Sequence, residues 1–170
     1  STDMRHFDNT ATFYTNNGSN FTKVSIPTAD VWSHGSDVGD LNNDGYLDIV
    51  MADLKSYNTT ISLNNQVNGF TAYVDPLGNA GDNRYGGSAV AIGNFMNNGG
   101  NNEIILTDAQ CAVISGTCSD SNTTKMFSVD FTGGVLTYTH EGDLPAFGTS
   151  GIDHSVEIAN HDFNEDGYAD

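Results

Sequence analysis

Two short acidic segments carry the residue pattern best suited to chemistry. Residues 40–48 read DLNNDGYLD and residues 162–170 read DFNEDGYAD, so both keep Asp, Asn, Asp, Gly, Tyr and Asp at matching positions. Alternating side-chain oxygens in such a loop face one concavity, and Ca²⁺ takes six to eight oxygen ligands of this kind. A glycine at the turn admits positive φ, which lets a tyrosine carbonyl and the last carboxylate complete the shell.

The pattern predicts two calcium sites. The predicted ligands are Asp40, Asn42, Asp44, the Tyr46 carbonyl and Asp48 in the first loop, and Asp162, Asn164, Asp166, the Tyr168 carbonyl and Asp170 in the second. The spacing resembles the first half of an EF-hand, but the last ligand falls at position nine rather than twelve, and strands are expected on either side. The alternative is a metal-free turn rich in Asp and Asn, in which three carboxylates would repel one another.

A degenerate third copy lies between these loops, at residues 94–103. Asn94, Met96 and Asn98 stand where the loops have Asp, Asn and Asp, and one residue is inserted before Glu103. A thioether is a poor ligand for a hard cation, and only one carboxylate remains. This copy is predicted to be a metal-free hairpin.

The segments around the loops are typical of short β-strands separated by turns. Strands poor in bulky side chains are expected at 35–39 and 89–93, apolar strands at 49–51 and 104–106, and hairpins at 13–21, 62–70 and 129–135. The loops recur at a spacing of about 60 residues, and four strands per repeat are typical of a β-propeller blade. The predicted fold is therefore all-β, a β-propeller of four-stranded antiparallel blades, with an ordinary close-packed β-sandwich as the alternative.

The charge balance restricts the possible partners. The chain has 170 residues, with 5 Lys and Arg against 22 Asp and Glu, and a net charge of −17. Such a surface repels nucleic acids and anionic membranes. The apolar stretches are far shorter than the ~20 residues that span a bilayer, and no basic-then-apolar leader opens the chain. We expect a soluble protein without membrane insertion, from which any export signal has been removed.

The two cysteines, Cys111 and Cys118, enclose a short loop. No His or Cys lies at zinc-finger spacing from them, which leaves a disulfide or two free thiols. We favour the disulfide, which would contribute about 2–3 kcal/mol through loop entropy. A disulfide would place the protein in an oxidising, extracellular setting.

Together these features resemble the FG-GAP/VCBS repeat family, the calcium-binding propeller repeats of integrin α-subunit heads and of many secreted microbial proteins. The resemblance rests on the two D-x-N-x-D-G-Y-x-D loops, on the Phe147-Gly148 and Tyr85-Gly86-Gly87 segments, and on the Asn-Asn-x-x-x-Gly-Phe hairpin at 64–70. It implies a ring of about seven blades, of which this chain would supply roughly three.

The resemblance also implies how the repeats divide the chain. Residues 1–30 would end a leading blade, 31–80 would form a blade with a calcium loop, 81–145 a blade with the degenerate loop, and 146–170 the start of the next blade with its calcium loop. The remaining blades of a larger propeller, or self-association, would cover the open blade faces.

In this family, the mouth of the propeller opposite the calcium loops resembles a ligand-binding face. Residues around the starts of the inner strands would line it, namely Trp32, His34, Arg84, Tyr85, Phe147, Asp153 and His154. For each of these residues, the alternative is packing and hydrogen bonding at a strand end.

The function indicated is extracellular recognition, in which a calcium-stabilised β-propeller presents loops to a glycan or protein ligand. The chain has no G-x-S-x-G, H-E-x-x-H or glycine-rich phosphate motif, so no catalytic residue is predicted and enzyme activity stays open. The alternatives are the propeller domain of a secreted carbohydrate-active enzyme similar to a polysaccharide lyase, and a purely structural repeat of a large surface protein. Turnover of acidic polysaccharides would distinguish the enzyme from the binding module.

Overall fold

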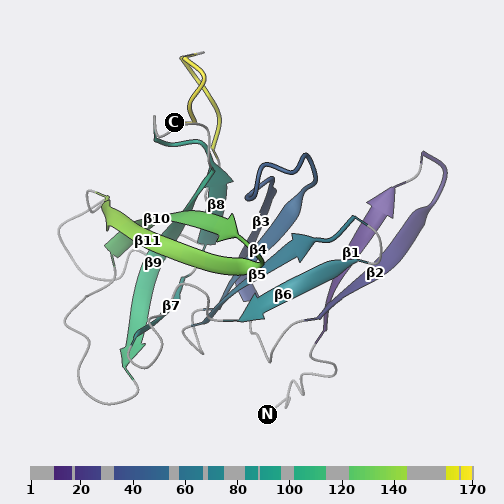
Figure 1. The fold of residues 1–170 in the computed structure, drawn as a ribbon, viewed down its shortest axis with the longest axis horizontal. Coiled ribbons are helices and arrows are strands. Elements are labelled where there is room, and N and C mark those ends of the chain that lie inside the picture. The colour runs from purple at the N-terminus through teal and green to yellow at the C-terminus, as the bar shows by residue number, and fades with distance from the viewer. Residues whose placement is uncertain are drawn as a thin grey trace, which may run out of the picture.

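The structure, a computed structural model, describes residues 10–16, 18–27, 33–53, 58–66, 69–74, 83–87, 89–96, 102–113, 123–144, 160–164 and 166–169. These residues form β-strands joined by turns and loops (Figure 1). None of the described segments is an apolar helix long enough to cross a membrane. The predicted all-β class is confirmed.

The strands form a leading hairpin and two larger antiparallel sheets. The leading hairpin consists of β1 (Thr10–Asn16) and β2 (Phe21–Pro27). The first sheet has the order β3 (Ser33–Gly39), β4 (Asp48–Asp53), β5 (Asn58–Asn64) and β6 (Phe70–Val74). The second sheet has the order β8 (Ala89–Gly93), β9 (Glu103–Val113), β10 (Thr123–Thr132) and β11 (Val135–Asp143), and β7 (Asn83–Gly86) pairs with the far end of β9.

The predicted four-stranded antiparallel sheets and the three predicted hairpins are confirmed. The β10–β11 hairpin shows the local cause, because Thr132 pairs with Val135 across a turn of Gly133 and Gly134. Both glycines have positive φ, 66° and 82°. A two-residue turn that matches strand twist requires this conformation at both positions, and glycine adopts it without steric cost.

The inner edge of the second sheet differs from that of the first. The first sheet begins with the single strand β3, whereas β7 and β8 pair with successive parts of the long strand β9. Gly87 lies between β7 and β8, and a Cβ at this position would be 2.7 Å from the carbonyl oxygen of Thr107. The close approach of β9 therefore excludes a side chain at this point.

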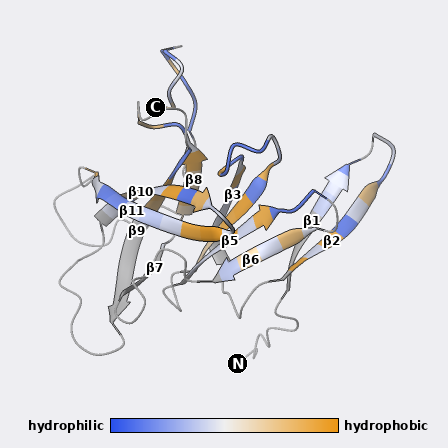
Figure 2. Ribbon diagram, viewed as in Figure 1, coloured by the Kyte–Doolittle hydropathy of each residue, from blue (hydrophilic) through white to orange (hydrophobic). Residues whose placement is uncertain are grey.

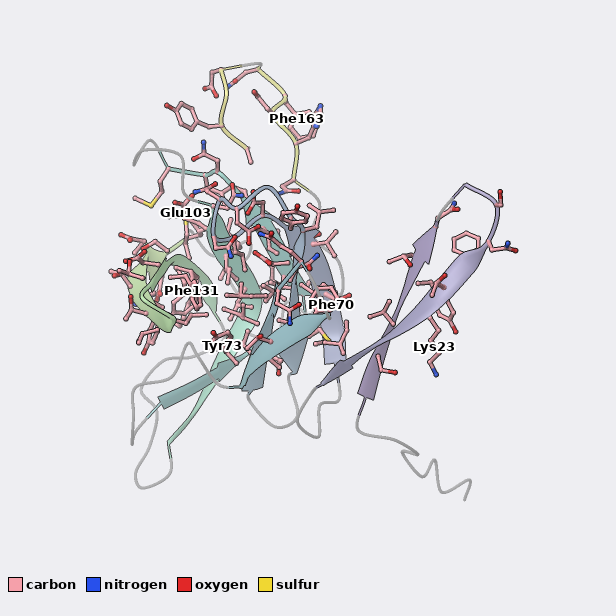
Figure 3. The ribbon with its side chains drawn as sticks, turned by 45° about the vertical axis from the view of Figure 1, so that its right-hand side comes forward. Lys23, Phe70, Tyr73, Glu103, Phe131 and Phe163 are labelled. Atoms are coloured by element: carbon pink, nitrogen blue, oxygen red, sulfur yellow. The ribbon has the colours of Figure 1, made fainter. Side chains whose placement is uncertain are left out.

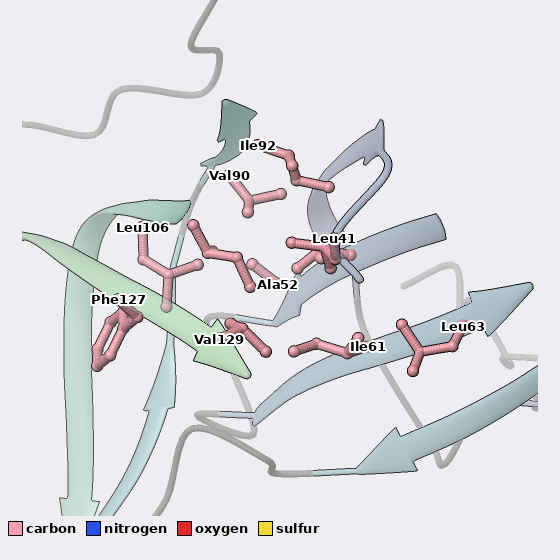
Figure 4. Packing of buried hydrophobic residues seen from close by; sticks show 11 residues of the cluster. Leu41, Ala52, Ile61, Leu63, Val90, Ile92, Leu106, Phe127 and Val129 are labelled. Atoms are coloured by element: carbon pink, nitrogen blue, oxygen red, sulfur yellow. The ribbon is translucent and has the colours of Figure 1, made fainter. Parts of the chain in front are cut away.

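The three units stack face to face, with a hydrophobic layer on each side of the first sheet. Between the two sheets lie Leu41, Val50, Ala52, Ile61, Leu63, Val90, Ile92, Ile104, Leu106, Phe127 and Val129 (Figure 4). The other face of the first sheet presents Ile49 and Met51, which cluster with Ile26 of the leading hairpin. Successive residues of β4 thus face different neighbours, as the period of two in a strand requires.

A lysine side chain is buried in the second sheet. Lys125 is 1% exposed, and its Nζ donates a hydrogen bond to Asp143 Oδ1 at 2.7 Å. The two residues are register partners in β10 and β11, and His140 Nε2 lies 3.0 Å from the same oxygen. The carboxylate compensates the buried ammonium group, which would otherwise be costly to bury.

Gly39 makes a close contact between the two sheets. A Cβ at this position would lie 2.5 Å from Ile92 Cγ2 and 3.0 Å from Ile92 Cβ. We expect Gly39→Ala to lower the free energy of unfolding by about 1–3 kcal/mol, because a packed interface resists an added methyl group. Chemical denaturation measures this change. The same substitution should cost less in an Ile92→Ala background, and an equal cost in both backgrounds would contradict this contact.

Candidate metal centre

The first acidic loop joins β3 to β4 and is anchored at both ends. Gly39 and Asp48 are register partners, so the strand ladder closes the loop. Leu41 is 3% exposed and belongs to the core between the sheets. The loop lies at the same end of the sheets as the C-terminal loop, and both are largely hydrophilic (Figures 1 and 2).

The side-chain oxygens of this loop face the inside of its turn. Asp40 accepts hydrogen bonds from Asp44 N, 3.0 Å from Oδ1, and from Gly45 N, 2.8 Å from Oδ2. Asn42 Oδ1 also accepts from Asp44 N at 3.1 Å, and Asp44 Oδ1 accepts from Tyr46 N at 2.9 Å. Gly45 has a φ of 85°, a conformation that favours glycine. The first three predicted ligands therefore converge on one short turn.

Asp48 closes the loop from a fully buried position. Its Oδ2 accepts a hydrogen bond from Leu41 N and its Oδ1 accepts one from Asn64 N, both at 2.9 Å. Burial raises the pKa of Asp48; the two backbone hydrogen bonds lower it in part, and the charges of Asp44 and Asp40 raise it further. A cation held among these three carboxylates would favour the ionised form of each.

The β5–β6 turn braces the first loop, a contact that the sequence analysis missed. Besides the bond from Asn64 N to Asp48, Asn64 Nδ2 donates to the Leu47 carbonyl at 3.4 Å. Gln66 Nε2 donates to Asp44 Oδ2 at 3.3 Å. The Asn-Asn-x-x-x-Gly-Phe motif indicates the hairpin, but no sequence signal shows that its turn reaches the acidic loop.

The loop at 162–169 repeats the hydrogen bonds of the first loop. Asp162 accepts from Asp166 N at 3.1 Å and from Gly167 N at 2.8 Å. Asn164 Oδ1 accepts from Asp166 N at 3.0 Å, and Asp166 Oδ1 accepts from Tyr168 N at 3.0 Å. Gly167 has a φ of 94°, close to that of its counterpart in the first loop. Asp170, the last predicted ligand, lies outside the described residues.

The middle loop is closed by the glutamate Glu103, where the first acidic loop has the aspartate Asp48. Glu103 is fully buried, and its Oε2 accepts hydrogen bonds from Phe95 N at 2.8 Å and Met96 N at 3.1 Å. Phe95 corresponds to Leu41, so Glu103 takes the position of Asp48 with a longer side chain. Asn98 lies outside the described residues, and the absence of metal in this loop stays a prediction.

The donor set of the two acidic loops fits a hard cation by its chemistry. Its members are carboxylate and amide oxygens, the ligands that Ca²⁺ takes, and no Cys or His is among them. In the part of the chain that the structure describes, no three His, Cys, Asp or Glu side chains are grouped tightly enough to form a metal cluster. The turn's own N–H groups donate hydrogen bonds to the carboxylate oxygens of Asp40 and Asp162.

The predicted ligand face is only partly within the described residues. The backbones of His34 in β3 and of Arg84 and Tyr85 in β7 are described, and Trp32, Phe147, Asp153 and His154 are not. His34 lies near the start of β3, at the end of the strand away from the acidic loop that follows Gly39.

The predicted disulfide also falls only partly within the described residues. The backbone of Cys111 lies in β9, opposite Tyr85 of β7. Cys118 lies outside the described residues, so the disulfide stays a prediction.

A comparison with protein families gave one match to this chain. A family model described as an FG-GAP-like repeat matches residues 4–51. The matched segment includes the leading hairpin, β3 and the first acidic loop. Searches of curated proteins and of solved structures gave no match.

Proposed function

We propose, because a family model described as an FG-GAP-like repeat matches residues 4–51, that this protein is a calcium-stabilised β-propeller module that binds an extracellular glycan or protein ligand. The two acidic loops would each bind one Ca²⁺. The opposite end of the sheets would present the ligand-binding residues.

The observation that carries the calcium proposal is the repeated geometry of the acidic loops. Two segments more than a hundred residues apart in sequence make the same four hydrogen bonds. In the first loop, the buried Asp48 faces the charges of Asp40 and Asp44, and no described Lys or Arg side chain forms an ion pair with any of the three. The charges of Asp40 and Asp44 act on the buried Asp48 carboxylate, and a bound cation would offset them.

Each group in the first loop has a distinct part in holding the ion. Asp40, Asn42 and Asp44 supply side-chain oxygens from the turn, the Tyr46 carbonyl follows it, and Asp48 supplies a carboxylate from the start of β4. Bound calcium would neutralise these charges and link the turn to the strand. Asn64 and Gln66 donate hydrogen bonds to the Asp48 and Asp44 carboxylates and connect the loop to the β5–β6 turn.

The layered stacking supports the propeller arrangement. In β4, Val50 and Ala52 face the second sheet, and in β9 the alternate residues Ile104 and Leu106 face back to the first sheet. This order of faces is the one expected when blades follow one another around an axis. The positions of His34, Arg84 and Tyr85 in the inner strands support a ligand face at the end away from the loops.

Calcium stoichiometry tests the proposal. Isothermal titration of the full chain should give two Ca²⁺ per chain, and Asp44→Ala should give one because it removes a carboxylate from the first loop. Asn98→Ala, in the degenerate loop, should still give two. Equal stoichiometry in the two variants, or no binding by the native chain, would contradict the assignment. Binding of the intact protein to a glycan array in calcium and in chelator tests the ligand part.

A further inference from the structure

The middle loop is hydrogen bonded to both acidic loops, the first at residues 40–48 and the C-terminal one at residues 162–170. Asn102 Nδ2 donates to the carbonyl oxygen of Asp40 at 2.6 Å. On the other side, Ala169 N donates to the carbonyl oxygen of Asn94 at 2.7 Å, and Asn94 Nδ2 donates to the carbonyl oxygen of Gly167 at 3.5 Å. Figure 1 places all three loops at one end of the sheets.

The two junctions use equivalent positions of the loops. Asp40 and Asn94 are the first residues of their loops, and Asn102 and Ala169 each precede the closing residue of the next loop. The first carbonyl of each loop therefore accepts a hydrogen bond from the loop that follows it. The donor is a side-chain amide at the first junction and a main-chain N–H at the second.

The strands beneath the loops are packed in the same sequence. A Cβ on Gly39 would be 2.5 Å from Ile92, and a Cβ on Gly93, the equivalent residue one repeat later, would be 2.7 Å from Asn160 Nδ2. Across the same junctions, Ile92 N donates to Asp37 Oδ2 at 2.8 Å and Asn160 Nδ2 donates to the Ile92 carbonyl. These contacts connect the strand ends that lie beneath adjacent loops.

We infer that the middle loop, which is predicted to bind no metal, couples the two calcium loops, so that an ion in one raises the affinity of the other. The inference rests on the proposed function. Asn94 and Asn102 act here as positioning residues. Asn94 donates a hydrogen bond to the Gly167 carbonyl of the C-terminal acidic loop, and Asn102 donates one to the main-chain carbonyl of the ligand Asp40.

The physical basis is the cost of ordering the loops. An ion in the first loop fixes Asp40, and through Asn102 it fixes the middle loop, which in turn holds Gly167. The second ion then binds to a C-terminal acidic loop that is already partly ordered, so less conformational entropy is lost on binding. This produces positive cooperativity. Each junction contains only one or two hydrogen bonds, so we expect a modest coupling, about fivefold in affinity.

A calcium titration of the full chain, native and variant, tests the inference. Native protein should bind two ions with a Hill coefficient above one. Asn102→Ala should still bind two ions, but independently, with the second affinity lowered about fivefold. Asn16→Ala, which removes an amide in the leading hairpin far from the loops, is the matched control and should keep the native cooperativity. If Asn102→Ala does not fold, Asn94→Ala removes the side-chain contact to Gly167, keeps the main-chain bond from Ala169, and should lower the cooperativity by a smaller amount.

The outcomes separate this inference from the calcium proposal. Two independent ions in the native protein, or unchanged cooperativity in Asn102→Ala, would overturn the coupling and leave the two sites in place. No calcium binding by the native protein would overturn both. Hydrogen exchange gives a second readout. Asp166→Ala removes a ligand of the C-terminal acidic loop, so calcium would bind only to the first loop. If the middle loop is coupled to the first, calcium should still slow amide exchange in the middle loop of this variant.

Discussion

Chelation of calcium is expected to lower the melting temperature of the full chain by roughly 10–20 °C. At a free calcium concentration 100 times the dissociation constant, each site adds about 2.7 kcal/mol to the stability of the folded state. For a domain of this size, each kcal/mol corresponds to roughly 2–4 °C. Without the ion, the charges of Asp40 and Asp44 act on the buried Asp48 carboxylate and destabilise its ionised form. Thermal melts in calcium and in chelator measure the effect, and coincident melting curves would contradict the proposed calcium sites.

The response to pH should have opposite signs in the two forms. In the metal-free protein, burial raises the pKa of Asp48. The stability that its protonation contributes is present below the unfolded pKa of about 3.9 and is lost as the pH rises through the folded pKa. In the calcium-loaded protein, protons compete with the ion, so acidification releases calcium and lowers stability. Comparison with Asp48→Asn isolates this group from the other carboxylates.

Phe127→Ala is expected to lower the free energy of unfolding by about 3–5 kcal/mol. The side chain is fully buried in the core between the sheets, and its ring lies 6.0 Å from that of Tyr138 and 5.2 Å from that of His140. Truncation removes these contacts and leaves a cavity that the strands of both sheets cannot readily fill. Chemical denaturation measures the loss.

Phe163→Ala is the matched control for this substitution. Phe163 is 76% exposed on the C-terminal loop (Figure 3), where its ring contacts that of His161. The same chemical change should therefore alter stability by no more than about 0.5 kcal/mol. Similar losses at the two positions would mean that the core between the sheets does not hold the fold together as described.

The strands and hairpins could be predicted because their signals are local. Continuous apolar runs at 49–51 and 104–106, and the paired glycines at 133 and 134, indicate strand and turn without reference to distant parts of the chain. The same holds for the four hydrogen bonds that the turns of both acidic loops share, whose partners lie within five residues of each other. Each of these features forms from a short stretch of sequence.

The contacts that the sequence analysis missed all depend on pairing between distant segments. Gln66 reaches Asp44 only because the register of β4 and β5 brings the two turns together. Lys125 is buried although lysine is usually exposed, and its partner Asp143 is set by a register that shifts at a bulge between Met126 and Phe127. The division of the inner strand into β7 and β8 likewise depends on the approach of β9 to Gly87.

The alternation of faces along β4 has a consequence for how this sequence can change over time. Ile49 and Val50 are covalent neighbours, yet one packs with Ile26 of the leading hairpin and the other with the second sheet. A change of volume at Ile49 would be compensated in the leading hairpin, whereas one at Val50 would be compensated in β8 or β9. Adjacent positions of one strand therefore evolve under separate constraints, and their substitutions should combine almost additively despite their proximity.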